Sequence, residues 1–126
     1  MAFNSKLNEF LADGKYCDVN IRIDGKSFKC HRLVLSAASE YFDTMFSEHS
    51  RGKYFTLEEV DAEIFEEVVR YVYTGDVILT EGNVLGVLRA SQFYKLLGVE
   101  ELCCQFIQKH LPVLGMTEIF IYASLK

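Results

Sequence analysis

The segment from residue 17 to residue 30 constrains the fold of this chain more than any other. Apolar and polar residues alternate over residues 17–23, which is the pattern of a strand with one buried face. The dipeptide Asp24-Gly25 favours a two-residue hairpin turn, and residues 26–30 then return as the partner strand. The sequence therefore predicts an antiparallel hairpin whose buried face carries Val19, Ile21, Ile23, Phe28 and Cys30.

Outside the hairpin, most apolar residues recur at a helical period. This pattern predicts helices over residues 4–12, 33–38, 40–46, 62–72, 81–97 and 99–110, with short strands over 54–57 and 77–79. Ser39, Asp61 and Thr80 are the predicted N-caps, and Gly98 is a predicted C-terminal cap. Paired helices that follow a hairpin, with short strands interspersed, make an α+β layout.

The composition is that of one folded domain. Half of the 126 residues are hydrophobic and a quarter are charged, which excludes a disordered chain. A net charge of −5 repels the phosphate backbone on average, so no nucleic-acid partner is expected. No apolar run approaches the ~20 residues that cross a bilayer, and the first six residues lack the features of a signal peptide. We therefore expect an intracellular, soluble protein with no membrane partner.

The cysteines and histidines give no pattern of catalysis or metal binding. Close pairs such as Cys-x-x-Cys, which zinc sites use, do not occur in the sequence. Cys30 and His31 are adjacent, but neighbours on an extended chain point to opposite faces and would not meet. His110 is expected near a helix end, where a positive charge suits the dipole. We expect no catalytic residue, no metal and no cofactor, and binding is the predicted class of function.

Several motifs, in one order along the chain, resemble the signature of the BTB/POZ domain. The resemblance covers roughly residues 4–111. It implies the BTB/POZ fold, an α+β fold in which a small, mostly three-stranded sheet with a hairpin caps a helical cluster. The motifs are Tyr16-Cys17-Asp18-Val19, Phe28-Lys29-Cys30-His31-Arg32-Leu33-Val34-Leu35, Ser39-Glu40-Tyr41-Phe42-Asp43-Thr44-Met45-Phe46, Ile64-Phe65-Glu66 with Tyr71-Val72-Tyr73-Thr74-Gly75, and Ala90-Ser91-Gln92-Phe93-Tyr94-Lys95-Leu96-Leu97-Gly98.

The segment 102–107, followed by Leu111, is similar to the kelch-like branch of this family. The resemblance implies a BTB/POZ domain at residues 1–112 and the start of a truncated BACK-type helical segment at residues 113–126. Kelch-like proteins are adaptors that dimerise, dock on cullin-3 and hold a substrate for ubiquitination through distal domains. A BTB transcription regulator with zinc fingers, which recruits corepressors, is the alternative, and a thiol enzyme is a distant third. The resemblance places the protein in the cytoplasm, with the nucleus as the alternative.

The resemblance also implies a dimer interface. In the family the dimer forms through the N-terminal helix and the helix equivalent to residues 33–38, and a charged pair lies near the dimer floor. An apolar stripe on the first helix and small residues on the second fit this role, although the stripe could also be an ordinary intramolecular core. The implied interface residues are Leu7, Phe10, Leu11, Asp18, Arg32, Ala37 and Ala38.

A second implied surface binds the N-terminal domain of cullin-3. Family members that dock on the cullin carry a hydrophobic–any–Glu triplet a few residues after the Met-Phe pair, but here that place holds Ser50-Arg51-Gly52. The apolar side chain and the acid are both missing, so we expect weakened cullin binding. The residues implied in this surface are Tyr41, Phe46, Ser50, Gly52 and Tyr94.

Overall fold

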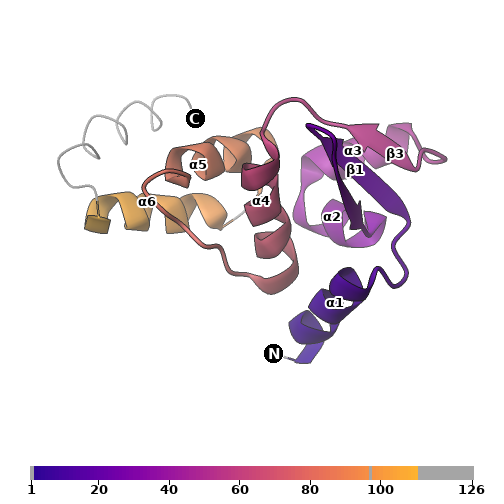
Figure 1. Cartoon of the computed structure of the whole chain (residues 1–126), viewed down its shortest axis with the longest axis horizontal. Helices are drawn as coiled ribbons and strands as arrows, with labels where there is room; N and C mark the ends of the chain where they lie inside the picture. Colours follow the sequence, from indigo (N-terminus) through magenta and orange to yellow (C-terminus); the bar gives the residue numbers. More distant parts are fainter. Residues whose placement is uncertain (1, 97, 111–126) are drawn as a thin grey trace.

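The computed structural model describes residues 2–96 and 98–110. Its elements are α1 (Ala2–Asp13), β1 (Val19–Ile23), β2 (Lys26–Cys30), α2 (Arg32–Ala38), α3 (Glu40–Glu48), β3 (Tyr54–Thr56), α4 (Ala62–Thr74), α5 (Val84–Phe93) and α6 (Val99–His110). The sheet lies with α2 and α3 at one end of the molecule, α5 and α6 lie at the other end, and α4 lies between them (Figure 1). The α+β prediction is confirmed. The expected BACK-type segment at residues 113–126 lies outside the described residues.

The three strands are ordered β2-β1-β3, with β1 antiparallel to β2 and parallel to β3. Val19 pairs with Cys30, which is the register expected from a turn centred on Asp24-Gly25. Both turn residues have positive φ, 51° at Asp24 and 80° at Gly25. This backbone follows the twist of the strands, and Asp and Gly tolerate it better than most residues. Local turn chemistry therefore sets the register of the hairpin.

Two of the predicted helix caps are confirmed. The Asp61 Oδ1 accepts a hydrogen bond from the Ile64 amide at 2.9 Å. The Ser39 hydroxyl accepts one from the Phe42 amide at 3.2 Å, and it also donates to the Tyr94 carbonyl at 2.6 Å. Ser39 therefore has a second role beside the predicted N-cap, because its hydroxyl also donates a hydrogen bond to another part of the chain. Its side chain ties the start of α3 to the connection between α5 and α6.

Four aromatic side chains, none of them exposed, form the centre of the core: Phe42, Phe65, Tyr73 and Tyr94. The rings of Phe42 and Tyr94 stack with centroids 5.1 Å apart, and Phe28 of β2 meets Phe65 of α4 edge-on at the same separation. Such pairs add about 0.5–1.5 kcal/mol each to the free energy gained from burying the rings. They join the sheet, α3, α4 and the α5–α6 connection into one core.

The predicted strand at residues 77–79 is wrong. Its backbone pairs with side chains instead of a strand: the Ile78 amide donates to the Glu67 carboxylate at 2.8 Å, and the Ile78 carbonyl accepts from the Asn83 amide group at 2.9 Å. Thr80 caps a preceding turn and not α5, because its hydroxyl accepts from the Asn83 amide at 3.1 Å. The helix itself begins at Val84.

The predicted helix over residues 81–97 is too long, because α5 ends at Phe93. Lys95 has a φ of 56°, which no α-helix tolerates, and Leu96 forms an isolated bridge with Ser39. The free energy gained by burying the Tyr94 and Leu96 side chains in the core offsets the helical hydrogen bonds lost where α5 ends. Gly98, with a φ of 92°, therefore lies in the turn before α6 and does not cap α5.

Substitution of Ser39 by Ala is expected to lower the free energy of unfolding by about 2 kcal/mol, since it removes an N-cap and leaves the buried Tyr94 carbonyl without this donor. Urea unfolding followed by circular dichroism measures the change. Ser47→Ala, at an exposed position of α3, is the matched control and should change stability by less than about 0.5 kcal/mol. Equal midpoints for the two variants would contradict the assigned role of Ser39.

Candidate interaction surfaces

The apolar stripe predicted on α1 is divided between two environments. Leu7 and Leu11 are half-buried and pack against the core of the same chain. Phe10 is also half-buried, but it meets Tyr16 edge-on at 5.3 Å, and the ammonium groups of Lys6 and Lys15 lie over its ring. Within the single chain, Leu7 and Leu11 therefore pack against the core, whereas Phe10 contacts residues at the surface.

The most exposed large apolar side chain of the described residues lies on α2. Leu33 is 81% exposed, and Ala37, four residues later and so on the same helix face, is exposed as well. Ala38 is half-buried, and Leu35 points into the core. Sequence reasoning proposed Ala37 and Ala38 for a dimer interface but missed Leu33, because a helix of seven residues gives too few turns to separate its faces.

Asp18 and Arg32 contact each other, although their charged groups do not form an ion pair. The Asp18 carboxylate accepts a hydrogen bond from the Arg32 backbone amide at 2.8 Å and so satisfies the first turn of α2. The Arg32 guanidinium turns away. It donates to the Phe46 carbonyl at 3.5 Å, to the His49 carbonyl at 3.1 Å and to the Gly52 carbonyl.

The guanidinium carbon of Arg32 also lies 5.1 Å from the centre of the Phe46 ring and 5.9 Å from that of Phe55. Together, three carbonyl groups and two aromatic rings stabilise the Arg32 guanidinium more than an ion pair with the exposed Asp18 carboxylate would. Arg32 consequently holds the loop between α3 and β3, which is the loop that carries Ser50 and Gly52.

His31 is buried, and its contacts could not be read from the sequence. The Tyr73 hydroxyl accepts from the His31 backbone amide at 3.0 Å and lies 2.8 Å from the ring Nδ1, and Nε2 lies 2.7 Å from the Lys15 carbonyl. These distances are all satisfied when Tyr73 donates to Nδ1 and Nε2–H donates to Lys15. The histidine therefore joins the segment after α1 to α4.

Two of the four cysteines, Cys30 and Cys103, have buried thiols that lack the features of a nucleophile. The Cys30 side chain is fully buried, and burial raises its pKa to about 12. Burial likewise raises the pKa of Cys103 to about 12. The Nε2 atom of His31 lies 3.7 Å from the Cys17 sulfur, a contact that spacing along the sequence does not predict. Thiols with such raised pKa values stay protonated at neutral pH and are poor nucleophiles.

Tyr41 lies in an aromatic cluster at the edge of the core. Its ring is 5.1 Å from both Phe93 and Tyr94. Phe46 is 5% exposed and Tyr94 is not exposed at all, so these two residues support the surface from beneath. The area that a partner can touch comes from Tyr41, which is half-buried, and from Phe93, which is 43% exposed and was not among the residues proposed from the sequence.

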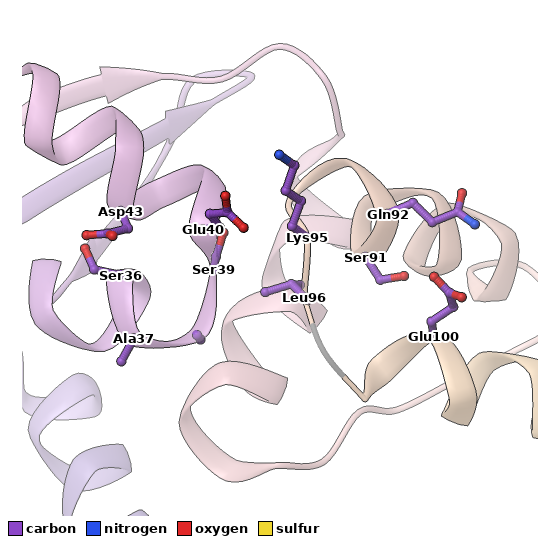
Figure 2. Close-up of a pocket in the computed structure, with 11 residues that line it drawn as sticks. Ser36, Ala37, Ser39, Glu40, Asp43, Ser91, Gln92, Lys95, Leu96 and Glu100 are labelled. Atoms are coloured by element: carbon purple, nitrogen blue, oxygen red, sulfur yellow. The ribbon is translucent and has the colours of Figure 1, made fainter. Parts of the chain in front are cut away.

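A groove of about 630 Å³ lies between the α2–α3 junction and the α5–α6 connection. Figure 2 shows Glu40 and Ser39 together on one wall of the groove, and Lys95 and Leu96 together on the opposite wall. The groove also carries Asp43 and Glu100, so its walls present charges of both signs with an excess of carboxylates. Glu40 and Gln92 of the groove are the sequence neighbours of Tyr41 and Phe93, so the groove and the aromatic cluster lie next to each other on α3 and α5.

The loop between α3 and β3 presents little apolar area. Ser50 is exposed, and Gly52 is half-buried. A Cβ atom added at Gly52 would lie 2.9 Å from the Cζ atom of Phe55 and 3.4 Å from the His49 carbonyl oxygen. Because Ser50 is exposed, a larger side chain there has room in the solvent, whereas any side chain at Gly52 has to displace the Phe55 ring.

The arrangement of helices and sheet, and the motifs that build it, agree with one known family. The model of the family described as BTB/POZ domain matches residues 7–111. The chain belongs to the BTB/POZ family. The BTB domain of zebrafish PATZ1 has the same fold, with a TM-score of 0.79 at 28% sequence identity, and the match covers 86% of this chain and 90% of that chain.

Among curated proteins, this BTB domain is similar to Kelch-like proteins. Kelch-like protein 21 of Danio rerio is 38% identical over 121 residues, which cover 94% of this chain and 20% of the relative. Kelch-like protein 40 of Xenopus laevis is 33% identical over 117 residues, which cover 90% of this chain and 19% of the relative. The chain thus spans about a fifth of the length of these relatives. The similarity to kelch-like proteins expected from the sequence is confirmed.

Family membership gives this BTB domain the general role of a protein-interaction domain. Within residues 2–96 and 98–110, no three His, Cys, Asp or Glu side chains are grouped so that they could hold a metal ion. None of the described helices has the length and apolar character needed to cross a membrane.

Proposed function

We propose that this BTB domain is the homodimerising module of a substrate adaptor for a cullin-3 RING ubiquitin ligase. The observation that carries the proposal is the similarity to Kelch-like proteins at 33–38% identity over at least 90% of the chain. The substrate would be held by further domains of a longer protein, and the assembly would work in the cytoplasm.

Exposed apolar residues on α1 and α2 support dimerisation. Leu33 is 81% exposed and Phe3 is 68% exposed, and the family uses these two helices for its dimer. Covering one leucine side chain contributes about 1.5–3 kcal/mol, and a two-fold interface counts each residue twice. The exposed face formed by Leu33 and Ala37 is therefore the part of α2 that we place at the centre of the dimer.

The face formed by Tyr41, Phe93 and the groove beside them supports cullin docking. It combines an aromatic edge with nearby charges at Glu40 and Lys95, a mixture typical of the core and rim of protein interfaces. The loop triplet that strengthens docking in the family is absent, so the proposed affinity is weaker than that of family members that carry it. Tyr41 and Phe93 then supply most of the apolar contact.

The alternative is a dimerisation module of a zinc-finger transcription regulator, because BTB domains of proteins other than Kelch-like proteins share this fold. The BTB domain of zebrafish PATZ1 matches the fold with a TM-score of 0.79 at 28% identity. This identity is lower than that of the Kelch-like proteins, and we therefore place the adaptor function first.

Calorimetry against the N-terminal domain of cullin-3 tests the adaptor proposal. We expect one cullin domain per protomer with a dissociation constant in the micromolar range, and Tyr41→Ala should weaken binding about tenfold because it removes apolar contact area. Tyr54→Ala, which removes an exposed tyrosine from the sheet, is the matched control and should leave the affinity unchanged. No measurable heat at micromolar concentrations would contradict the adaptor proposal and leave the zinc-finger alternative.

A further inference from the structure

The sheet of this BTB domain has an outer face whose strand residues belong to neither the proposed dimer surface nor the proposed cullin surface. The pairing registers align residues of the three strands in two rows across this face. One row is Lys29–Asn20–Tyr54, and the other is Ser27–Arg22–Thr56. The two rows contain no carboxylate, although the chain as a whole has 18 acidic and 13 basic residues. The outer face is thus locally basic on an acidic protein.

A hollow of about 430 Å³ opens on the first of these rows. Lys29 and Lys53 line it, both exposed, and within the described residues the ion pairs involve other cations. The only acid in its lining is Asp18, whose carboxylate already accepts from the Arg32 amide. The two ammonium groups are therefore available to a ligand.

Asn20 gives a second and independent indication of a ligand. Its backbone amide donates to the Lys53 carbonyl at 2.7 Å, but its side-chain oxygen is buried in the lining of the hollow and has no hydrogen-bond partner among the described residues. A buried polar atom without a partner costs free energy, and a ligand donor that the oxygen meets when the Asn20 side chain turns toward the hollow removes this cost.

Tyr54 completes the row with an exposed aromatic ring. The ring is 68% exposed, and the Arg22 guanidinium carbon lies 5.6 Å from its centre. The exposed Tyr54 ring therefore offers a flat apolar surface beside the ammonium groups of Lys29 and Lys53. The hollow and its margin therefore combine three kinds of contact: ammonium groups, one hydrogen-bond acceptor and one aromatic face.

We propose that this outer face binds an acidic peptide segment of a partner protein in an extended conformation. Carboxylates of the peptide meet Lys29 and Lys53, a peptide N–H donates to the Asn20 side-chain oxygen, and an apolar side chain packs on Tyr54. A nucleic-acid backbone would bring acceptors to the ammonium groups but no regular donor to Asn20, and the net charge of −5 opposes it. The site borders both proposed surfaces, since Asp18 of the implied dimer interface lines the hollow and Lys53 follows Gly52 of the implied cullin surface, but Lys29, Asn20 and Tyr54 belong to neither.

Fluorescence anisotropy with a labelled decapeptide of alternating Glu and Val tests the charge contacts. The Lys29→Glu/Lys53→Glu variant should bind the peptide about tenfold more weakly than the wild type. Lys6→Glu/Lys109→Glu changes the net charge equally but lies on α1 and α6, and its affinity should stay within about twofold. Equal loss in both variants, or no binding of the wild type at millimolar peptide, would overturn the proposal.

The hydrogen bond to Asn20 is tested by a double-mutant cycle. Methylation of the backbone nitrogens of the decapeptide should weaken its binding to the wild type by about fivefold more than its binding to Asn20→Val. An identical loss with both proteins would overturn the assigned contact. A single-stranded oligonucleotide of the same charge should compete poorly, and competition at the affinity of the peptide would assign the face to polyanions in general and contradict the proposal.

Discussion

Leu33→Asp is expected to convert the proposed dimer into a monomer of 14.5 kDa at micromolar concentration. The substitution removes one leucine from each half of a two-fold interface and buries two carboxylates in its place. The loss of leucine burial alone amounts to about 3–6 kcal/mol per dimer, which raises the dissociation constant at least about 100-fold. Sedimentation equilibrium over a range of protein concentrations measures this change directly.

The fold of the single chain should survive Leu33→Asp, which makes the experiment decisive. Leu33 is 81% exposed and lies in the first turn of α2, where a negative charge is favourable. Ser47→Asp on α3 adds the same charge at an exposed position and should leave the mass unchanged. A monomeric wild type, or a folded Leu33→Asp variant that stays dimeric, would contradict the placement of the interface on α2.

A charge at Phe10 is also expected to weaken the dimer, but it gives a less direct test. The Phe10 ring meets Tyr16 at 5.3 Å within the same chain, so Phe10→Asp alters the end of α1 as well as a surface. Leu33 has no comparable ring contact among the described residues. The two variants together separate an effect on association from an effect on the position of α1.

The parts of the fold that depend on local chemistry could be predicted from the sequence. Asp24-Gly25 sets the hairpin register, and the Ser39 and Asp61 side chains begin α3 and α4 as expected. Each of these features is decided within about four residues of the chain. A single sequence contains all the information that such a choice requires.

The errors occurred where distant residues decide the local structure. Tyr94 and Leu96 do not continue α5, because their side chains are buried in the core and their backbone contacts Ser39. The Ser39 hydroxyl donates to the Tyr94 carbonyl, and the Ser39 backbone forms a bridge with Leu96. The apolar residues 77–79 have the composition of a strand, but Glu67 and Asn83 satisfy the Ile78 backbone that a neighbouring strand would otherwise pair. Neither partner could be identified from spacing along the chain.

The candidate surfaces show the same limit. The alternation over residues 17–23 predicts that Asn20 and Arg22 share a face, but the row that joins Lys29 to Tyr54 also requires the parallel pairing of β3 with β1. Similarly, the sequence places Arg32 beside Asp18, and only the folded chain shows that its guanidinium turns to the carbonyls of the α3–β3 loop. Contacts between elements therefore determine which side chains remain free for partners.

Ser50→Met is expected to strengthen binding of the cullin-3 N-terminal domain by about 10- to 100-fold. The substitution restores the apolar side chain of the missing triplet at an exposed position, and burial of one large apolar side chain contributes about 1.5–3 kcal/mol. The same loop holds Arg32 through backbone carbonyl groups, so a new side chain at Ser50 does not remove those contacts. Calorimetry with the same cullin domain measures the gain.

Gly52→Glu, which restores the acid of the triplet, should gain less than Ser50→Met. A Cβ atom at this position lies 2.9 Å from Phe55 Cζ, so the Phe55 ring has to move away from its contact with the Arg32 guanidinium. Ser5→Met on α1 is the matched control for added apolar surface and should leave cullin affinity unchanged. If Ser50→Met binds no better than this control, the missing triplet does not limit docking; nanomolar binding by the unmodified chain would lead to the same conclusion.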